Sequence, residues 1–322
     1  MFRTEPWAIH KDSTLGARLR GRRHALFSSE RRRGVAFSLA GALCSAIYLF
    51  PYKRAAAFAP AETLAFALLV MAAVSSSLWS LWRRTSSRPP VLRERALLWR
   101  TAVALSLATI TGNFCGAQAV ARLEPAMNSV LLRTEVVFVG GLGALLLGER
   151  VTPGLALGAG TALCGLAVMN WPLTLGSAAG AAWSLGAAAS FGLMQVLTRR
   201  VIADISPASV NTLRLWLAVG LLGCVPHTVE RSLEAGVQFW LFVAAAALFG
   251  PFAGRLCIMY SLRGLRAAES ALLLLLAPLF AFLLGYVGYG TVPSGPQVAG
   301  SLLMLLGVAL PSLERAAAQR LQ

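Results

Sequence analysis

Charged residues are scarce in this chain. Asp, Glu, Lys and Arg make up only 13% of its 322 residues, whereas a soluble domain has about 25%. Hydrophobic residues account for 57%, and the mean hydropathy is +0.67. A surface with so little charge excludes an ordinary water-soluble domain and indicates a protein that lies in a lipid bilayer.

The residue patterns of metal, redox and ATP-driven proteins are also missing. The five cysteines fall singly in separate apolar segments without a CxxC spacing, and the three histidines lie outside those segments. We therefore expect no metal site and no cofactor, and we expect the cysteines to be small buried hydrophobic residues. Because there is no GxxxxGK[ST] loop, we expect no ATP hydrolysis by this chain.

Acidic residues are fewer than basic ones, 13 against 29, which gives a net charge of +16. Few of the basic residues lie within apolar segments, and this distribution is typical of a membrane protein's cytoplasmic side rather than of a surface that binds nucleic acid. Residues 1–33 are rich in arginine and have no apolar stretch. We expect them to be a disordered cytoplasmic tail, not a signal peptide, and residues 314–322 to be a second tail.

Ten apolar segments are long enough to cross a membrane. A hydrocarbon core of about 30 Å needs roughly 20 residues of helix, and short turns or charged residues separate the segments. The predicted spans are residues 34–52, 61–82, 96–117, 124–147, 153–171, 177–198, 207–226, 237–259, 266–289 and 295–313.

The charges between the spans predict the orientation. With the N-terminus in the cytoplasm, only four basic residues fall on the opposite side, namely Lys53, Arg54, Arg122 and Arg231. Cytoplasmic segments are enriched in Lys and Arg, so both ends of the chain are predicted to be cytoplasmic. This orientation agrees with an even number of spans.

A repeat relates the two halves of the chain. Residues 123–167 align with residues 265–309 at a constant shift of 142, and Phe37-Ser38-Leu39 matches Trp183-Ser184-Leu185 at a slightly larger shift. Because each half holds five predicted spans, the second copy must be inverted, as in many secondary transporters. The glycines that carry the match are Gly143, Gly148, Gly158 and Gly165, aligned with Gly285, Gly290, Gly300 and Gly307.

We therefore predict an all-α integral membrane protein with ten transmembrane helices, arranged as two inverted five-helix repeats. The first repeat is residues 34–171 and the second is residues 177–313. We refer to these as the first half and the second half.

Several short motifs occur in a defined order. They are Glu124-Pro125-Ala126, Leu146-Leu147-Gly148-Glu149-Arg150-Val151-Thr152, Gly158 through Gly165, Ala277-Pro278-Leu279-Phe280 and Gly300 through Gly307. With these motifs, residues 34–313 resemble the ten-helix EamA-type branch of the drug/metabolite transporter superfamily. The resemblance implies two EamA-like repeats and a transporter whose substrate is an amino acid, another metabolite, a nucleotide or a drug.

The chain departs from this family pattern at two places. The glycine-glutamate pair that ends span four is Gly148-Glu149, but its partner after span nine is Gly290-Thr291. The family's frequent arginine early in the second span of each half occurs as Arg214 and is absent near Ala67. We therefore expect an asymmetric site.

Arg133 and Glu135 lie near the middle of span four, where a charged side chain costs about 2.5–3.5 kcal/mol on insertion scales. On one continuous helix these residues would be about 200° apart around the axis, so they could not both face one cavity squarely. Two interpretations are open: a fixed ion pair with other helices, or a role for Glu135 in binding substrate or protons. Glu135 is the proton-coupling candidate because burial favours a neutral carboxyl group.

Other candidates for a substrate cavity are polar residues at matching positions of the repeat. Asn113 aligns with Arg255, and Gln118 aligns with Tyr260. Inverted copies are expected to line one central cavity with such pairs, although Gln118 and Tyr260 are also explained as hydrated helix ends. Weaker candidates are Tyr48, Asn128 and Gln195, the last of which can also join helices by a hydrogen bond.

Three residues have predicted structural or gating roles. Glu149 is a carboxylate at a helix end and Arg214 lies within span seven, and both are expected to be structural. Pro278 removes one backbone hydrogen bond from span nine and is expected to bend it, either as a hinge or as a static bend.

These features predict a secondary transporter of the bacterial inner membrane, acting as a monomer or homodimer on a small-molecule substrate. The mixture of Arg133, Arg255 and Glu135 suits a zwitterion such as an amino acid, and the family resemblance favours export. Alternatives are an exporter of amphipathic cations or nucleotide-type metabolites, or a membrane sensor or assembly subunit. An intramembrane enzyme would need paired carboxylates, a nucleophile with a base, or a metal cluster, which the spans lack.

Overall fold

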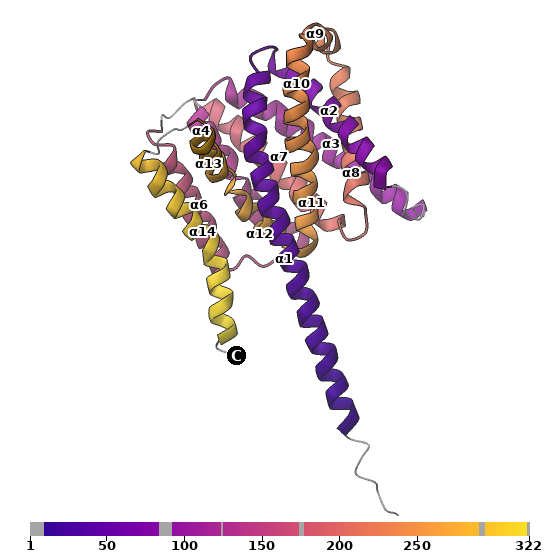
Figure 1. The fold of residues 1–322 in the computed structure, drawn as a ribbon, viewed down its shortest axis with the longest axis vertical. Helices are drawn as coiled ribbons and strands as arrows, with labels where there is room; N and C mark the ends of the chain where they lie inside the picture. Colours follow the sequence, from indigo (N-terminus) through magenta and orange to yellow (C-terminus); the bar gives the residue numbers. More distant parts are fainter. Residues whose placement is uncertain (1–9, 84–91, 124, 174–176, 290–293, 321–322) are drawn as a thin grey trace, which may run out of the picture.

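The computed structural model describes residues 10–83, 92–123, 125–173, 177–289 and 294–320, and these residues form a bundle of helices without strands (Figure 1). The elements are α1 (His10–Ala55), α2 (Ala61–Arg83), α3 (Leu92–Val120), α4 (Pro125–Arg133), α5 (Glu135–Leu147), α6 (Pro153–Met169), α7 (Ala178–Val201), α8 (Pro207–Gly223), α9 (Thr228–Glu234), α10 (Gly236–Ala247), the π-helix η2 (Leu248–Gly254), α11 (Arg255–Gly264), α12 (Ala267–Leu274), α13 (Ala277–Tyr289) and α14 (Gly295–Arg320).

Seven helical stretches within the described residues are long and apolar enough to cross a membrane. An eighth candidate is the pair α8 and α9, which is bent by 100°. The predicted spans at 96–117 and 153–171 lie in α3 and α6, which are not among the seven, and α6 has only 17 residues. An integral, multi-pass protein follows from these helices, whereas the number of ten spans stays a prediction.

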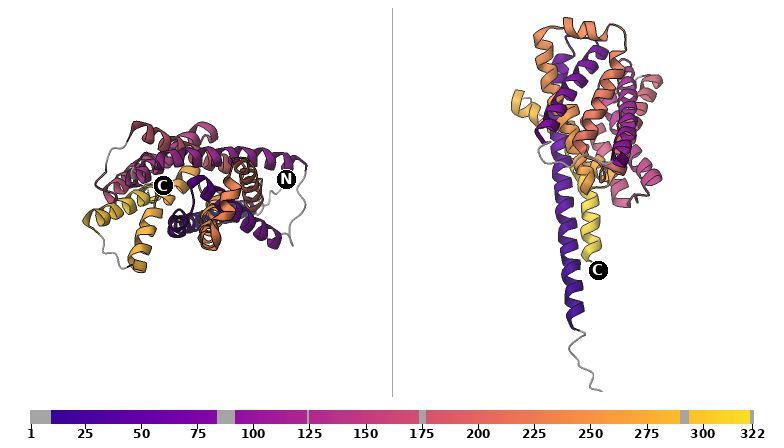
Figure 2. Two further views of the ribbon diagram at one scale, coloured as in Figure 1. Left: turned by 90° about the horizontal axis from the view of Figure 1, so that it is seen from above. Right: turned by 90° about the vertical axis from the view of Figure 1, so that its right-hand side faces the viewer.

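The helices of the two halves pack in a reciprocal pattern. α7 lies along α3, and α1 lies along α10, η2 and α11. In the repeat alignment α1 corresponds to α7, the first helix of the second half, and α3 corresponds to the α10–α11 segment, its third helix. The first helix of each half therefore packs on the third helix of the other half. α2 packs on α8, α5 on α12 and α6 on α14; the last pair runs side by side in Figures 1 and 2.

The repeat glycines allow α6 and α14 to pack closely. A Cβ atom on Gly158 would lie 2.5 Å from the carbonyl oxygen of Gly307, and one on Gly165 would lie 2.6 Å from that of Gly300. These two contacts exchange under the repeat, because Gly158 corresponds to Gly300 and Gly165 to Gly307. Residue numbers fall along α14 as they rise along α6, so the two helices are antiparallel. Small residues let helix backbones approach closely in membranes.

Two helices that we predicted to be continuous are interrupted at equivalent positions. Thr134 separates α4 from α5, and Leu275 and Leu276 separate α12 from α13. At the repeat shift of 142, Thr134 corresponds to Leu276. Pro278, which we expected to bend a continuous span, is instead the second residue of α13, where a missing N–H group costs no helical hydrogen bond.

The ends of the chain extend beyond the bundle on one side. α1 begins at His10 and α14 ends at Arg320, and both project from the same end of the bundle (Figures 1 and 2). We call this the α1/α14 end. Residues 10–33, which we expected to be disordered, are helical here, and their Ala, Leu and Arg residues are strong helix formers.

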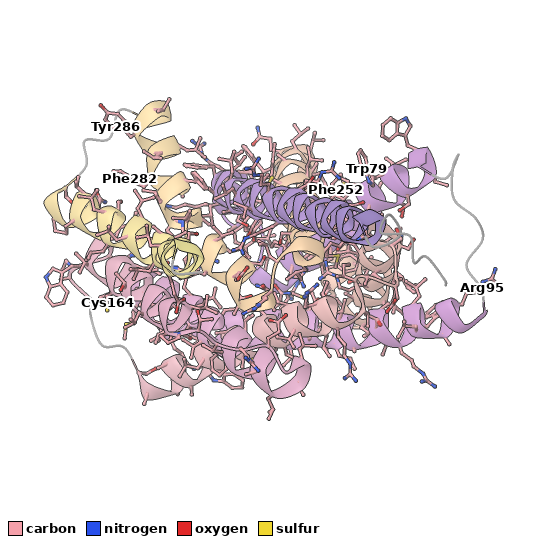
Figure 3. All side chains as sticks on the ribbon, turned by 90° about the horizontal axis from the view of Figure 1, so that it is seen from below. Trp79, Arg95, Cys164, Phe252, Phe282 and Tyr286 are labelled. Carbon is pink, nitrogen blue, oxygen red and sulfur yellow. The ribbon has the colours of Figure 1, made fainter. Side chains whose placement is uncertain are left out.

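The cysteines do not all lie inside the bundle. Cys115 is buried as expected, whereas Cys164 and Cys224 are exposed. Cys164 on α6 and Tyr286 on α13 point away from the bundle (Figure 3). The expectation of buried cysteines was wrong for these two because, in a membrane protein, an outward-facing surface is as apolar as the core.

Candidate functional site

The interruption of the fourth span places two charged residues together. α4 ends at Arg133 and α5 begins at Glu135, with Thr134 between them. Both side chains line the same small cavity. The prediction that they could not both face one cavity squarely assumed one continuous helix, whereas the chain is interrupted at Thr134 and both residues line this cavity.

This cavity lies at the interface of the two halves. Its volume is about 10 Å³, which is room for one water molecule. The walls come from α4, α5, α7 and α12, and both interrupted spans contribute to them. The lining residues are Arg133, Glu135, Val136, Gln195, Ala271, Leu274 and Leu275.

Glu135 is held by a hydrogen bond from the second half. The side-chain Nε2 of Gln195 donates to Glu135 Oε1 at 2.5 Å. Gln195 is only 2% exposed, and its own Oε1 atom has no hydrogen-bond partner among the residues that the structure describes. Arg133 and Arg255 are near enough for their positive charges to act on the Glu135 carboxylate. The cavity is therefore lined by a carboxylate, an amide and one cationic side chain, that of Arg133.

A second polar cluster surrounds Arg214 in α8. Its Nη1 atom donates to Thr109 Oγ1 at 2.8 Å, and its Nη2 atom donates to Asn211 Oδ1 at 2.9 Å. Asn211 in turn donates to the carbonyl oxygen of Pro251 in η2 at 3.4 Å. The π-helix is followed directly by Arg255, whose charge also acts on Arg214. π-Helical turns are frequently found at functional sites.

The structure places the aligned pair Asn113 and Arg255 in different surroundings. Asn113 is exposed, and its amide donates to the carbonyl oxygen of Thr109 in its own helix at 2.7 Å. Arg255 is buried, with 8% of its surface exposed. The two residues therefore differ in burial, and the expectation that both face one cavity stays a prediction.

Two further candidates lie near helix ends. Gln118 accepts a hydrogen bond from Arg122 at 2.5 Å at the end of α3. Tyr260 in α11 stacks on Phe37, with 5.3 Å between the ring centres, and the Arg263 guanidinium lies 5.6 Å from its ring centre. Neither residue lines the small cavity, so the alternative of a helix-end role suits both better.

Tyr48 and Asn128 serve packing between helices. The Tyr48 ring fills the space beside Gly250, where a Cβ atom would lie 2.6 Å from the ring, and it packs on Tyr52. Asn128 accepts a hydrogen bond from Ser184 at 2.8 Å. Its counterpart in the repeat, Ser270, accepts from Ser38 through its carbonyl oxygen at 3.1 Å. These two contacts join the halves reciprocally, because Ser38 corresponds to Ser184.

Sequence reasoning missed Thr109 and Asn211, which hold Arg214, and the apolar wall of the cavity. Asn211 and Arg214 are three residues apart in α8, a spacing that puts side chains on one face of a helix. This spacing could have indicated in the sequence that Asn211 is a partner of Arg214. The wall residues Ala271, Leu274 and Leu275 carry no signal because their types are common throughout the spans.

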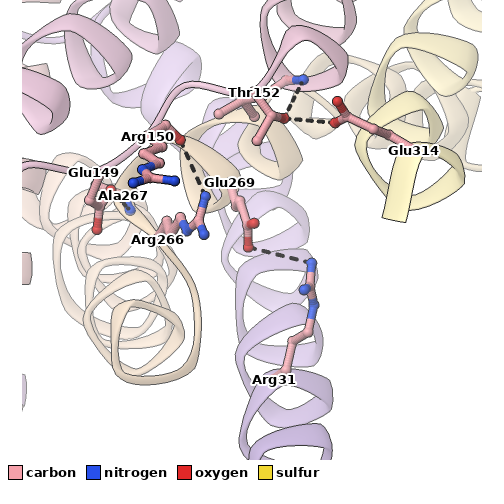
Figure 4. A network of polar contacts seen from close by, with 9 residues as sticks. Arg31, Glu149, Arg150, Thr152, Arg266, Ala267, Glu269 and Glu314 are labelled. Atoms are coloured by element: carbon pink, nitrogen blue, oxygen red, sulfur yellow. Dashed lines mark hydrogen bonds and ion pairs between the residues drawn. The ribbon is translucent and has the colours of Figure 1, made fainter. Parts of the chain in front are cut away.

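A polar network at the α1/α14 end connects the halves (Figure 4). Glu149 Oε2 accepts from the backbone N–H of Ala267 at 3.0 Å, and Glu149 Oε1 lies 3.3 Å from Arg199 Nε. Arg266 donates to the carbonyl oxygen of Arg150 at 3.2 Å. Glu149, expected to be structural, thus ties the end of α5 to α7 and to the start of α12.

The same network borders a larger cavity of about 350 Å³. Arg31 and Glu269 form an ion pair of 3.5 Å across it, and Thr152 donates to Glu314 at 2.7 Å (Figure 4). Its walls come from α1, α6, α7, α11, α12 and α14 with the connections between them, so this end of the bundle is hollow but crossed by polar contacts.

Three comparisons with known proteins each find similarity to this chain. The family model of the EamA-like transporter family matches residues 32–171 and again residues 178–313. A protein of Streptantibioticus cattleyicolor named "Probable terminal-alkyne amino-acid exporter" is 27% identical over 209 residues, which are 61% of this chain and 70% of that protein. A solved crystal structure is similar with a TM-score of 0.72 at 20% identity, over 90% of this chain and 98% of that chain. The last likeness shows the fold alone.

Proposed function

Because this chain belongs to the EamA-like transporter family, and is thus a membrane transporter rather than an enzyme, we propose that it exports a small polar metabolite such as an amino acid. Transport proceeds by alternating access, in which the two halves move against each other around the cavity between them. The observation that carries the proposal is the charged cavity at the two interrupted spans, lined by Arg133, Glu135 and Gln195.

Interrupted helices suit a transport site. Where a helix stops inside the membrane, its end presents backbone groups and side chains to a polar ligand, and many secondary transporters bind substrate at such breaks. The breaks at Thr134 and at Leu275–Leu276 are equivalent in the repeat and border one cavity. This arrangement supports a shared site for both halves.

Reciprocal contacts support the inverted arrangement of the halves. The pairs Ser38–Ser270 and Ser184–Asn128 exchange under the repeat, as do the glycine contacts between α6 and α14. A two-fold axis in the membrane plane, between inverted copies, produces contacts of this kind. Alternating access then follows from one movement that closes one side as it opens the other.

The described state corresponds to a closed cavity. The space beside Glu135 holds no more than one water molecule, and the network around Glu149 ties the halves at the α1/α14 end. We propose that this network is the gate on the cytoplasmic side. The distribution of basic residues supports both termini in the cytoplasm and the inner membrane as the location.

The energy for export comes from the substrate gradient or from protons. Glu135 is the proposed proton carrier because, among the described residues, it is the carboxylate that lines the cavity. Its hydrogen bond from Gln195 and the nearby positive charges stabilise the ionised form, whereas the apolar surroundings stabilise the neutral form. Substrate entry or departure changes this balance and thereby couples proton transfer to transport.

Transport by the purified protein in liposomes tests the proposal. Liposomes loaded with an unlabelled amino acid are placed in a trace of the same labelled amino acid, and the exchange is measured for each compound of a panel. The proposal predicts saturable uptake of at least one amino acid only in liposomes that contain the protein. Equal uptake with and without the protein for every compound would contradict it.

A further inference from the structure

We propose that Arg255 and Arg214 form a binding site for an anionic group, a carboxylate or a phosphate, and that the exported class of compound carries net negative charge. This inference rests on the proposed transport function and deepens it. Arg214 is given a new role, because the sequence indicated only a structural one for it.

Arg255 offers donors that no residue in the described part of the chain accepts from. Its side chain is 8% exposed, yet its Nε and Nη2 atoms have no hydrogen-bond partner. A buried donor without a partner is costly, and a buried charge more so. Nε and one Nη atom of a guanidinium group lie side by side and match the two oxygens of a carboxylate or phosphate. Arg255 therefore presents an unfilled position for such a group.

Arg214 adds a second cation that has no carboxylate in contact. Its side chain is 2% exposed, its Nη atoms donate to the uncharged groups of Thr109, Asn211 and Met194, and its Nε atom has no partner among the described residues. These hydrogen bonds fix the orientation of the guanidinium group. Asn211, which accepts from Arg214, donates to the carbonyl oxygen of Pro251 in η2, and Arg255 directly follows η2, so contacts connect the two cations.

The charge inside the bundle is unbalanced. The spans contain three buried or half-buried arginines, Arg133, Arg214 and Arg255. The carboxylate whose negative charge acts on Arg133 and Arg255 is Glu135. Glu135 already receives the hydrogen bond from Gln195. One carboxylate cannot neutralise three guanidinium groups, and charge in the membrane interior needs a partner. An anionic substrate supplies it, whereas an amphipathic cation would increase the imbalance.

A binding test on the unchanged protein compares acids with their neutral amides. The full-length protein in detergent is titrated with glutarate and glutaramide, with succinate and succinamide, and with inorganic phosphate. The inference predicts that at least one anion binds and that each acid that binds does so about 10- to 100-fold more tightly than its amide. Preference for the carboxylates or for phosphate identifies the anionic group.

Variants assign this preference to the two arginines. Arg255→Gln and Arg214→Gln are each expected to weaken binding of the preferred anion about 10- to 100-fold and to leave the affinity for its amide unchanged. Arg214→Lys keeps the charge but lacks the Nε donor, so an intermediate loss is expected. Arg200→Gln, an exposed arginine in the last turn of α7, makes the same change in net charge and is expected to have no effect.

The outcomes separate this inference from the proposed function. If no acid binds more tightly than its amide, or if cations bind best, the anion site is wrong even where the liposomes show transport. A loss of binding equally large in Arg200→Gln would also overturn it, because the effect would then come from net charge. The comparison of acids with amides in the unchanged protein decides the question should a variant fail to fold.

Discussion

Glu135 and Gln195 are the residues on which the chemistry of the cavity depends. Gln195 comes from α7 and Glu135 from α5, so their 2.5 Å hydrogen bond crosses from one half to the other. Any movement of the halves that opens the cavity must lengthen or break this bond. Proton binding at Glu135 and the movement of the halves are thereby connected through one contact.

Glu135→Gln is expected to abolish proton-coupled transport. Glutamine has the size of glutamate but cannot take up or release a proton, so flux driven by an imposed pH gradient should stop and the remaining exchange should not vary with pH. The measurement is uptake in liposomes at several pH values, with Glu230→Gln, an exposed residue of α9, as the control. Unchanged uptake with an unchanged pH profile would contradict the role of Glu135.

The sequence predicted which charged residues lie inside the bundle, but it did not predict how their side chains are arranged. Arg133, Glu135 and Arg255 were found because charges are rare in apolar spans. Their arrangement was not found, because it depends on the break at Thr134, a residue with no helix-breaking chemistry. Asn113 shows the opposite case: its repeat position matched Arg255, but its side chain is exposed.

Helix interruptions and close helix contacts determine the shape of the site. Pro278 lies two residues after the interruption at Leu276, and the repeat alignment places its counterpart, Val136, two residues after Thr134. The second break could therefore have been predicted from the first. The π-helix η2 contains Pro251, a residue that cannot donate to the regular helical ladder. The apolar length of the segments predicted the helices, whereas these local departures needed the three-dimensional structure.

Gly165→Ala is expected to destabilise the packing of α6 on α14. The new Cβ atom would lie 2.6 Å from the Gly300 carbonyl oxygen and 2.7 Å from the Met304 nitrogen, which are backbone atoms and cannot move aside easily. Overpacking of this kind costs about 1–3 kcal/mol, so the melting temperature in detergent should fall.

Gly160→Ala on the same helix is the matched control. No atom lies within 4 Å of a Cβ at Gly160, and alanine is a better helix former than glycine. Its melting temperature should be equal to that of the unchanged protein or higher. Equal melting temperatures for both variants would contradict the close packing of these helices.

Glu149→Ala is expected to loosen the α1/α14 end. The substitution removes the acceptor for the Ala267 N–H group and the partner of Arg199. Hydrogen bonds to charged groups contribute about 1.5–3 kcal/mol, so a fall in the melting temperature should follow. Glu230→Ala, which removes an exposed carboxylate, should leave it unchanged. A variant as stable as the parent would show that the network does not hold the halves together.

The molecule as a whole is organised by contacts that exchange under the repeat. The first helix of each half packs on the third helix of the other, and the serine and glycine contacts occur in reciprocal pairs. The repeat in the sequence predicted the existence of two related halves. It did not predict which helices meet, because packing between the halves depends on faces that apolar composition does not distinguish.

The central claim is that the halves are inverted across the membrane, and cysteine labelling tests it most directly. Ser294 is the repeat equivalent of Thr152, and Val151 is the residue directly before Thr152. Val151 and Ser294 are exposed and are each replaced by cysteine in a protein whose five native cysteines have been removed. A maleimide that cannot cross membranes should label Ser294→Cys in intact cells and Val151→Cys only after permeabilisation. Labelling of both from the same side would contradict the inverted arrangement and the transport mechanism built on it.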